Sequence, residues 1–304
     1  MRNVIHRCRV TEPSMRGSAD DRDMESKEYV PRGLSRLRAG RRPGPRRNTR
    51  LSIISSRRNS MIVIEKLNSE FGEIKILKYR AEELFLYMQE GYFQSEADRN
   101  GISLAPYVHA IYGLLAQVNA RDILLIGCGG GSLGTMLGKT ASRITIVDKN
   151  AESFRIARKY FGLPRTIECH VADGREFLLS PGHRYDAIIL DAYDGDCVPE
   201  HMCTVDFFRL VRSRLDRTRG CLLANVHAWH DLDRAPDQYA AVASCAWNDV
   251  RLLDIRGVVG RNALVLAGNV RALRKPALLV PPLSHSEEIT SELNRMAFRP
   301  WHFC

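Results

Sequence analysis

The fold is decided by Ile123-Leu-Leu-Ile-Gly127-Cys-Gly-Gly-Gly131-Ser-Leu133, a stretch that predicts a buried strand, a glycine-rich turn and the start of a helix. Glycines let a backbone approach a ligand closely, and the N-terminus of a helix offers free N–H donors. We therefore expect Gly127, Gly129 and Gly131 to lie against a bound ligand.

Asp148 strengthens this prediction. It lies 21 positions after Gly127, directly after the next predicted strand, Ile144–Val147. An acid in that place can accept hydrogen bonds from both hydroxyls of a ribose, so the unit predicts a nucleoside site. A tight turn without a ligand is the structural alternative, and a dinucleotide is the alternative ligand. Because Ser132 breaks the G-x-G-x-x-G register, an adenosyl-sulfonium ligand is favoured.

Strands and helices alternate along this part of the chain. Further apolar strands are predicted at Ile167–Val171, Ala187–Leu190 and Leu222–Val226, and helices at Leu133–Lys139, Ala151–Phe161, Arg175–Leu179 and Val205–Leu215. This alternation predicts an α/β fold with a doubly wound parallel sheet. A helix over Pro236–Trp247 and a hairpin of Val250–Ile255 and Ala263–Ala267 follow. An antiparallel hairpin at the end of such a sheet is typical of class I methyltransferase-like (Rossmann-like) folds.

A period-two alternation precedes the α/β unit. It predicts a small antiparallel β-meander with strands near Met61–Leu67, Glu73–Tyr79, Leu84–Met88 and Gly91–Gln94. We therefore divide the chain into four parts. These are a basic arm (1–60), the meander (61–104), a Rossmann-like nucleoside-binding catalytic domain (105–276) that begins with a helix over Pro106–Val118, and a C-terminal tail (277–304).

The net charge of +10 resides in the arm. Residues 1–60 hold 16 basic and 6 acidic residues, whereas residues 61–304 hold 29 of each sign. Ten arginines and no acid between Pro31 and Ser60 predict a disordered segment. A nucleic-acid-binding protein carries its basic surplus on the folded surface, so nucleic acid is not expected as a partner, except through the arm of residues 1–60.

The composition argues against a membrane protein and against a metal site. No apolar run is long enough to cross a bilayer, and arginines interrupt any secretory signal at the N-terminus. The eight cysteines are scattered and form no C-x-x-C, which favours reduced thiols in a cytoplasmic protein. Cys197, His201 and Cys203 lack the second ligand pair of a zinc site, so no metal is expected.

Acidic residues also follow the third and fourth predicted strands. Asp173 and Gly174 come after the third strand, where an acid can accept the adenine amino group; a helix cap is the alternative. The fourth strand is followed by Asp191, Tyr193 and Asp194, at the edge where ligands bind in such folds. A polyamine is a multiple cation whose amines have pKa values near 10, so carboxylates can hold it and remove a proton from it. A solvated acidic loop is the alternative.

Together these motifs resemble the polyamine aminopropyltransferase (spermidine synthase-like) family. The resemblance runs from Ser69 to about Asn269. It rests on Ser69-Glu-Phe-Gly-Glu-Ile-Lys-Ile76, Gly91-Tyr-Phe-Gln94-Ser95, the glycine loop, Asp148, Asp173-Gly174 and Asp191-x-x-Asp194. It implies that Asp191 is the catalytic proton acceptor, Asp194 a polyamine contact, Asp148 a ribose contact, Asp173 an adenine contact and Gln94 a nucleoside contact. Tyr107 and Tyr193 are further substrate-binding candidates, with a helical core position as the alternative for Tyr107.

The chain departs from the family pattern at two places. Gly130 stands where the family loop carries an Asp, which normally meets the amino end of the aminopropyl group. The segment from Glu96 to His109 replaces an acidic family segment, and its spacing differs. These differences concern the donor and the acceptor, and they leave the nucleoside motifs intact.

The resemblance implies an enzyme that transfers an aminopropyl group from decarboxylated S-adenosylmethionine to a polyamine such as putrescine. Family habit also implies a homodimer. An S-adenosylmethionine-dependent methyltransferase on the same fold is one alternative. A non-catalytic relative that binds a nucleoside or a polyamine is the other.

The charge distribution yields a prediction about the arm. Because residues 61–304 are electrically neutral and contain every motif, deleting residues 1–60 should leave nucleoside affinity and thermal stability unchanged. Calorimetric titration with methylthioadenosine and a thermal melt of both proteins test this. A large loss of either property on truncation would mean that the arm belongs to the fold.

Overall fold

The computed structural model describes residues 61–302 apart from residues 82 and 196. The basic arm expected for residues 1–60 therefore lies outside the described residues.

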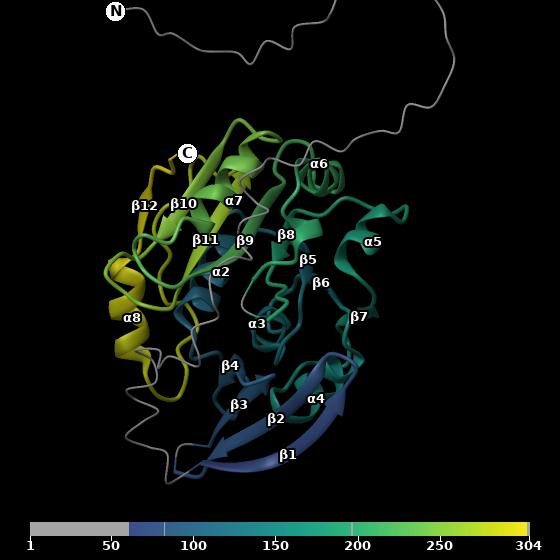
Figure 1. The fold of residues 1–304 in the computed structure, drawn as a ribbon, viewed down its shortest axis with the longest axis vertical. Helices are drawn as coiled ribbons and strands as arrows, with labels where there is room; N and C mark the ends of the chain where they lie inside the picture. Colours follow the sequence, from purple (N-terminus) through teal and green to yellow (C-terminus); the bar gives the residue numbers. More distant parts are fainter. Residues whose placement is uncertain (1–60, 82, 196, 303–304) are drawn as a thin grey trace, which may run out of the picture. The chain divides into compact units, whose positions relative to one another are not determined.

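Residues 61–97 form a four-stranded antiparallel sheet, whose strands lie in chain order (Figure 1). The strands are β1 (Met61–Ser69), β2 (Gly72–Tyr79), β3 (Leu84–Gln89) and β4 (Tyr92–Ala97). Two of the turns between them place a glycine at positive φ, 100° at Gly72 and 82° at Gly91, where other residues are strained. The predicted meander is confirmed.

The following residues build an eight-stranded sheet. Its strands are β5 (Asp122–Ile126), β6 (Arg143–Asp148), β7 (Glu168–Val171), β8 (Ala187–Leu190), β9 (Cys221–Ala228), β10 (Val250–Asp254), β11 (Arg261–Gly268) and β12 (Ala297–Arg299). They lie in the order β12-β10-β11-β9-β8-β5-β6-β7. The five strands from β9 to β7 are parallel, whereas β11, β10 and β12 pair antiparallel. This confirms the methyltransferase-like arrangement, and it places the switch in strand order between β5 and β8.

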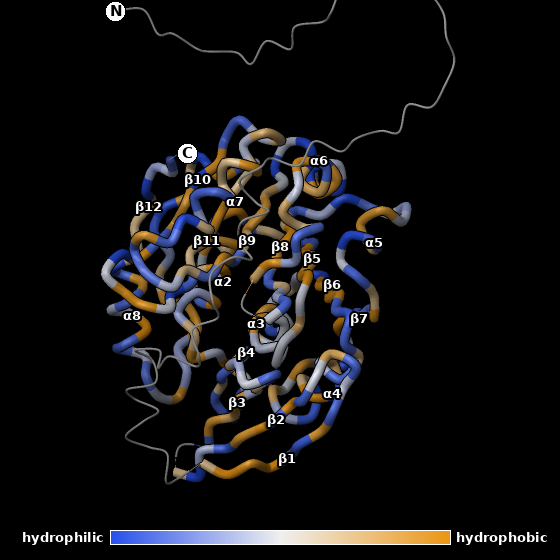
Figure 2. The backbone as a smooth tube through the Cα atoms, in the orientation of Figure 1, coloured by the Kyte–Doolittle hydropathy of each residue, from blue (hydrophilic) through white to orange (hydrophobic). Residues whose placement is uncertain are grey.

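Helices cover both faces of this sheet. They are α2 (Pro106–Gln117), α3 (Ser132–Leu137), α4 (Ala151–Tyr160), α5 (Gly174–Leu179), α6 (Val205–Arg214), α7 (Ala235–Ser244) and α8 (Ser286–Arg295), with a short 3-10 helix, η3 (Glu200–Met202). Ile123 and Leu125 of β5 pack with α2, α3, α4 and α8, whereas Leu124 and Ile126 pack with α5, α6 and α7. Figure 2 shows the resulting band of hydrophobic residues along the central strands.

The meander packs on α4. Ile76 and Tyr87 are buried with Phe161, which follows the helix. Beside this contact, the carboxylate of Glu65 on β1 accepts hydrogen bonds from Lys159, Tyr160 and Arg155, which lower the pKa of Glu65 to about 2. An apolar contact and an ionic one therefore hold the meander against the α/β unit.

Residues 277–302 contain more structure than the tail we expected. Ile289 and Leu293 of α8 are buried, and β12 pairs with β10 at the edge of the main sheet. Both elements are short, Pro281-Pro282 precedes them, and only Ile289 and Leu293 mark the buried face of α8, so the periodic signal in the sequence is brief. Tertiary contacts order the segment.

Buried charges attach β12. The carboxylate of Asp254 accepts hydrogen bonds from Arg261 (2.8 Å) and Arg299 (2.9 Å), and Arg299 also forms a two-point contact with Asp237. Burial alone would raise the pKa of Asp254, but these arginines outweigh burial and hold it below its usual value. Each buried charge in this group faces an opposite charge, which is the condition for burying it.

Asp254→Asn should therefore destabilise the protein. It leaves two arginines without their shared carboxylate, and breaking a buried pair costs about 3–5 kcal/mol. Urea unfolding at neutral pH measures the loss. Because the pKa of Asp254 is lower in the folded chain, its stabilisation is present above about pH 4 and is lost as pH falls through the folded value. The variant should lack this part of the pH dependence.

Asp206→Asn provides the matched control. Asp206 pairs with Arg209 on the surface of α6, and both side chains are more than 60% exposed. Such a pair contributes about 1 kcal/mol or less. Equal losses in the two variants would contradict a stabilising role for the buried group.

Candidate functional site

The glycine loop and the end of β8 lie against each other. Because β5 and β8 are parallel neighbours, Gly127 and Asp191 follow them at the same edge of the sheet. Gly127 has a φ of 99°, and a Cβ at this position would lie 2.2 Å from the carbonyl oxygen of Asp191. Only glycine allows both the conformation and the approach. The predicted nucleoside loop and the predicted proton acceptor therefore belong to one site.

Asp148 lies beneath the loop, at the end of β6. Its Oδ2 accepts a hydrogen bond from the backbone N–H of Cys128 (2.7 Å), and its Oδ1 accepts one from Asn150 (2.7 Å). Burial raises the pKa of Asp148, and the backbone donors, including Gly129, partly offset the rise. A carboxylate offers about four acceptor positions, so with three backbone donors one position remains for a hydroxyl donor.

Strand β4 brings the meander to the same loop. The backbone N–H of Gly130 donates to Ser95 Oγ (2.8 Å), and a Cβ at Gly129 would lie 3.0 Å from that oxygen and 3.9 Å from the carbonyl oxygen of Gln94. Gln94 is half-buried here. The structure thus places the predicted nucleoside glutamine beside the glycines.

Asp191 is held from two sides. Its Oδ1 accepts a hydrogen bond from Asn225 Nδ2 on β9 (2.8 Å), and its Oδ2 accepts one from the Tyr107 hydroxyl on α2 (3.2 Å). Burial raises the pKa of Asp191, and these two hydrogen bonds only partly oppose the rise. The carboxylate is therefore a better proton acceptor than an ordinary aspartate, and it has a fixed orientation.

Asn225 is a site residue that the sequence analysis missed. The Asn225 side chain is buried, and its Oδ1 has no hydrogen-bond partner within the described part of the chain. Tyr193, a substrate-binding candidate, donates its hydroxyl to the backbone carbonyl of Asn225 (2.9 Å) and so supports this strand. A single polar residue inside the apolar run from Cys221 to Val226 was the available signal.

Asp173 and Gly174 have structural tasks in the fold. Asp173 Oδ1 caps α5 by accepting from the backbone N–H groups of Arg175 (2.8 Å) and Glu176 (3.2 Å). Its Oδ2 lies 3.0 Å from Nε2 of His201, which the sequence analysis did not place in the site. A Cβ at Gly174 would lie 2.3 Å from Ile126, so this glycine allows α5 to pack on β5. The helix-cap alternative for Asp173 is thus observed, and one lone pair on Oδ2 remains for an adenine amino group.

The loop after β8 carries the remaining candidate. Asp194 is exposed, and its backbone N–H donates to the carbonyl of Cys197 (2.8 Å), which closes a narrow turn.

Of the residues considered as metal ligands, Cys203 donates its thiol to the Pro199 carbonyl (3.4 Å). Across the described residues, 61–81, 83–195 and 197–302, no three His, Cys, Asp or Glu side chains form a group that could hold a metal ion. Within the same ranges, no helix has the length and apolarity needed to cross a membrane.

Sequence comparison identifies relatives of one kind. No protein-family model matches the chain. The polyamine aminopropyltransferase of Vibrio vulnificus is 34% identical over 128 residues, which are 40% of this chain and 42% of that protein. The polyamine aminopropyltransferase of Neisseria meningitidis serogroup A is 36% identical over 118 residues, 36% of this chain and 44% of that protein. The chain thus spans less than half the length of these curated relatives.

Solved structures agree on the fold. A probable spermidine synthase from Corynebacterium glutamicum superposes with a TM-score of 0.64 and 19% identity, over 78% of this chain and 91% of that one. The spermidine synthase of Thermotoga maritima gives a TM-score of 0.57 and 18% identity, over 75% and 82% of the two chains. The resemblance predicted from the sequence is confirmed: the chain is similar to the polyamine aminopropyltransferases and has a spermidine synthase-like fold.

Proposed function

We propose that this protein is an aminopropyltransferase that uses decarboxylated S-adenosylmethionine as donor and a polyamine such as putrescine as acceptor. The observation that carries the proposal is the position of Asp191. Its backbone carbonyl lies against Gly127 of the glycine loop, and its half-buried carboxylate is oriented by Tyr107 and Asn225. A nucleoside-binding loop next to a fixed base is the arrangement that alkylation of an amine by a sulfonium requires.

In the proposed reaction, Asp191 accepts one proton from the attacking amine. An amine nitrogen attacks the carbon next to the sulfonium sulfur, and the carbon–sulfur bond breaks with its electron pair left on sulfur. The products are an alkylated amine and a neutral thioether, and the surplus amine proton passes to Asp191. Since polyamine amines have pKa values near 10, a base with a raised pKa beside the attacking nitrogen aids this transfer.

The charge and polarity of the site favour a cationic acceptor. Asp191 and Asp194 bring two carboxylates to this edge of the sheet, while Asn225 Oδ1 lacks a donor among the described residues. The ammonium groups of a polyamine can donate to acceptors of this kind. Buried acceptors without partners are costly, so a ligand that supplies N–H donors is stabilised here.

The donor would occupy the glycine loop. Asp148 retains one acceptor position for a ribose hydroxyl, and Gly129 (φ 51°) and Gly131 (φ 73°) add no side chains to the loop. Asp173 already caps α5 and contacts His201, so an adenine amino group would have to share its Oδ2. Each of these two acids therefore has one acceptor position left for the nucleoside.

Asp191→Asn should abolish most of the turnover while the nucleoside still binds. The amide keeps the shape and loses the base, and general bases contribute about 10²–10⁴-fold. Methylthioadenosine affinity should change little because it rests on the loop and Asp148. Because burial raises the pKa of Asp191, activity of the parent should fall as pH drops through that value, and the residual activity of the variant should lack this limb.

Asp194→Asn is the matched control, since it makes the same chemical change on the exposed side of the same loop. It should raise the KM for the amine more than it lowers kcat. If Asp191→Asn turned over amines as fast as the parent, Asp191 would not be the base. If no amine were alkylated by the parent, a non-catalytic binding protein would be the better account.

Position 130 bears on the choice of donor. The family acid at this place is replaced by Gly130, and Ser95 occupies the space beside it. A Cβ at Gly130 would lie 2.7 Å from Ser95 Cβ and 3.2 Å from the Phe161 ring. A simple return of the acid therefore collides with β4. Because Gly130 is neutral, it does not repel the carboxylate of intact S-adenosylmethionine, which is the donor that the alternative function, a methyltransferase, would use.

The double variant Ser95→Gly with Gly130→Asp makes room for the acid. It should shift the ratio of dissociation constants toward the decarboxylated donor by roughly ten- to a hundredfold, because a charge-assisted contact contributes about 1.5–3 kcal/mol. Calorimetry with both sulfonium compounds measures the ratio, and Ser95→Gly alone is the control. A parent protein that strongly prefers intact S-adenosylmethionine and methylates an acceptor would favour the methyltransferase instead.

A further inference from the structure

A group of arginines surrounds a cavity that lies several strands away from the glycine loop along the sheet. The cavity has a volume of about 420 Å³ and lies among the end of β10, strand β12 and the C-terminal end of α8. Its charged lining consists of Arg256, Arg295, Arg299 and Asp254, with His302 at one side. Three guanidinium groups thus face one carboxylate.

That carboxylate is already neutralised. Asp254 is fully buried, and its oxygens accept hydrogen bonds from Arg261 and Arg299. Asp237 holds the other side of Arg299 through two contacts of 2.9 and 2.8 Å. Arg299 is consequently fixed in place, and no free acid among the lining residues opposes an anion.

The other two arginines carry the surplus charge. Arg256 follows β10, Arg295 ends α8, and both are exposed. In the part of the chain that the structure describes, neither guanidinium forms a hydrogen bond or an ion pair. Two unpaired arginines that line one cavity from different elements can bind an anion between them, and the planar guanidinium matches phosphate oxygens well.

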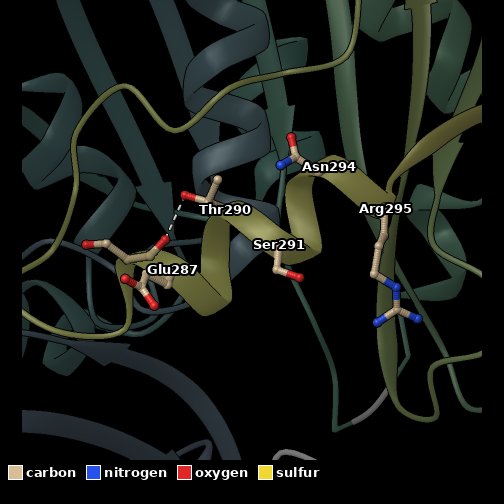
Figure 3. A pocket seen from close by; sticks show the side chains of 6 residues that line it. Glu287, Thr290, Ser291, Asn294 and Arg295 are labelled. Atoms are coloured by element: carbon tan, nitrogen blue, oxygen red, sulfur yellow. Dashed lines mark hydrogen bonds between the residues drawn. The ribbon is translucent and has the colours of Figure 1, made fainter.

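The neighbouring hollow on α8 differs. This cavity, about 550 Å³, is lined by residues of one helix: Ser286, Glu287, Thr290, Ser291, Asn294 and Arg295. Figure 3 shows Arg295 at the end of that helix, with Glu287 near its start and the Thr290 hydroxyl donating to the carbonyl of Ser286. The charge of Glu287 balances that of Arg295 there, and the Thr290 hydroxyl already has a hydrogen-bond partner within the helix. The surplus of positive charge belongs to the cavity beside β12.

The cavity is separate from the nucleoside site. Four neighbouring strand pairs separate β10 from β5, which at about 4.8 Å per pair places them roughly 19 Å apart. We propose that the cavity between β10, β12 and α8 binds a small phosphate-bearing anion through Arg256 and Arg295. A volume of 420 Å³ lies within the usual range of small-molecule sites, about 300–1,000 Å³, and exceeds the needs of a single ion. A diphosphate group is therefore the fitting probe.

Calorimetric titration of the full-length chain with inorganic pyrophosphate tests the proposal. Methylthioadenosine is present at saturation so that the glycine loop is occupied. The parent should show a saturable site, and Arg256→Gln and Arg295→Gln should each weaken it by roughly ten- to a hundredfold, the effect of one charge-assisted contact. Both side chains are exposed and unpaired, so neither change should alter the thermal melt.

Arg217→Gln is the matched control. Arg217 is an exposed arginine between α6 and β9, where β9 begins, at the opposite edge of the sheet from Arg256, and its loss removes the same charge. Its variant should bind pyrophosphate within twofold of the parent. Equal weakening by all three substitutions would reduce the effect to net charge and overturn the proposal. Unchanged affinity in Arg256→Gln or Arg295→Gln, or the absence of saturable binding to the parent, would overturn it as well.

Discussion

The contact between the backbone of Gly127 and the carbonyl of Asp191 is the constraint on which the rest of the structure depends. It exists because β5 and β8 are adjacent parallel strands on either side of the switch in strand order. Ligands bind at such points because the loops that follow the two strands diverge to opposite faces of the sheet. Here the divergence is preceded by a contact so close that a single methyl group would prevent it. The glycine loop and Asp191, to which we assign the donor and the proton transfer, therefore share one backbone junction.

Four aspartates of the protein have two kinds of surroundings. Asp254 and Asp237 are surrounded by arginines, and the pKa of each lies below its usual value although burial works in the opposite direction. Asp191 and Asp148 receive hydrogen bonds from neutral donors only, and burial raises their pKa values. Neutral donors orient a carboxylate without cancelling its charge, so it keeps its capacity for a cation, a hydroxyl or a proton. This difference separates the acids of the scaffold from those of the proposed site.

The meander is part of the site as well as a neighbour of α4. It supplies Ser95 to the glycine loop, and its edge strand fills the space beside Gly130. Ser95 therefore occupies the space that a side chain at position 130 would need. The basic cavity beside β12 arises similarly. The segment after β11 folds back, adds a strand to the sheet and brings Arg295 and Arg299 to Arg256.

The sequence by itself determined the alternation of strands and helices, the glycine loop, the acids at the strand ends and the family resemblance. These features depend on local periodicity and on residues whose conformational or chemical properties are unusual, such as glycine and aspartate. Only the tertiary structure decided that Asn225 and Tyr107 orient Asp191, that Ser95 occupies the space next to Gly130, and that residues after 277 complete the sheet. Asp173 shows the same division, since its place after a strand was predictable but its contact with His201 was not. Contacts between residues 28 to 84 positions apart leave no periodic signal, because they arise from the packing of elements already formed.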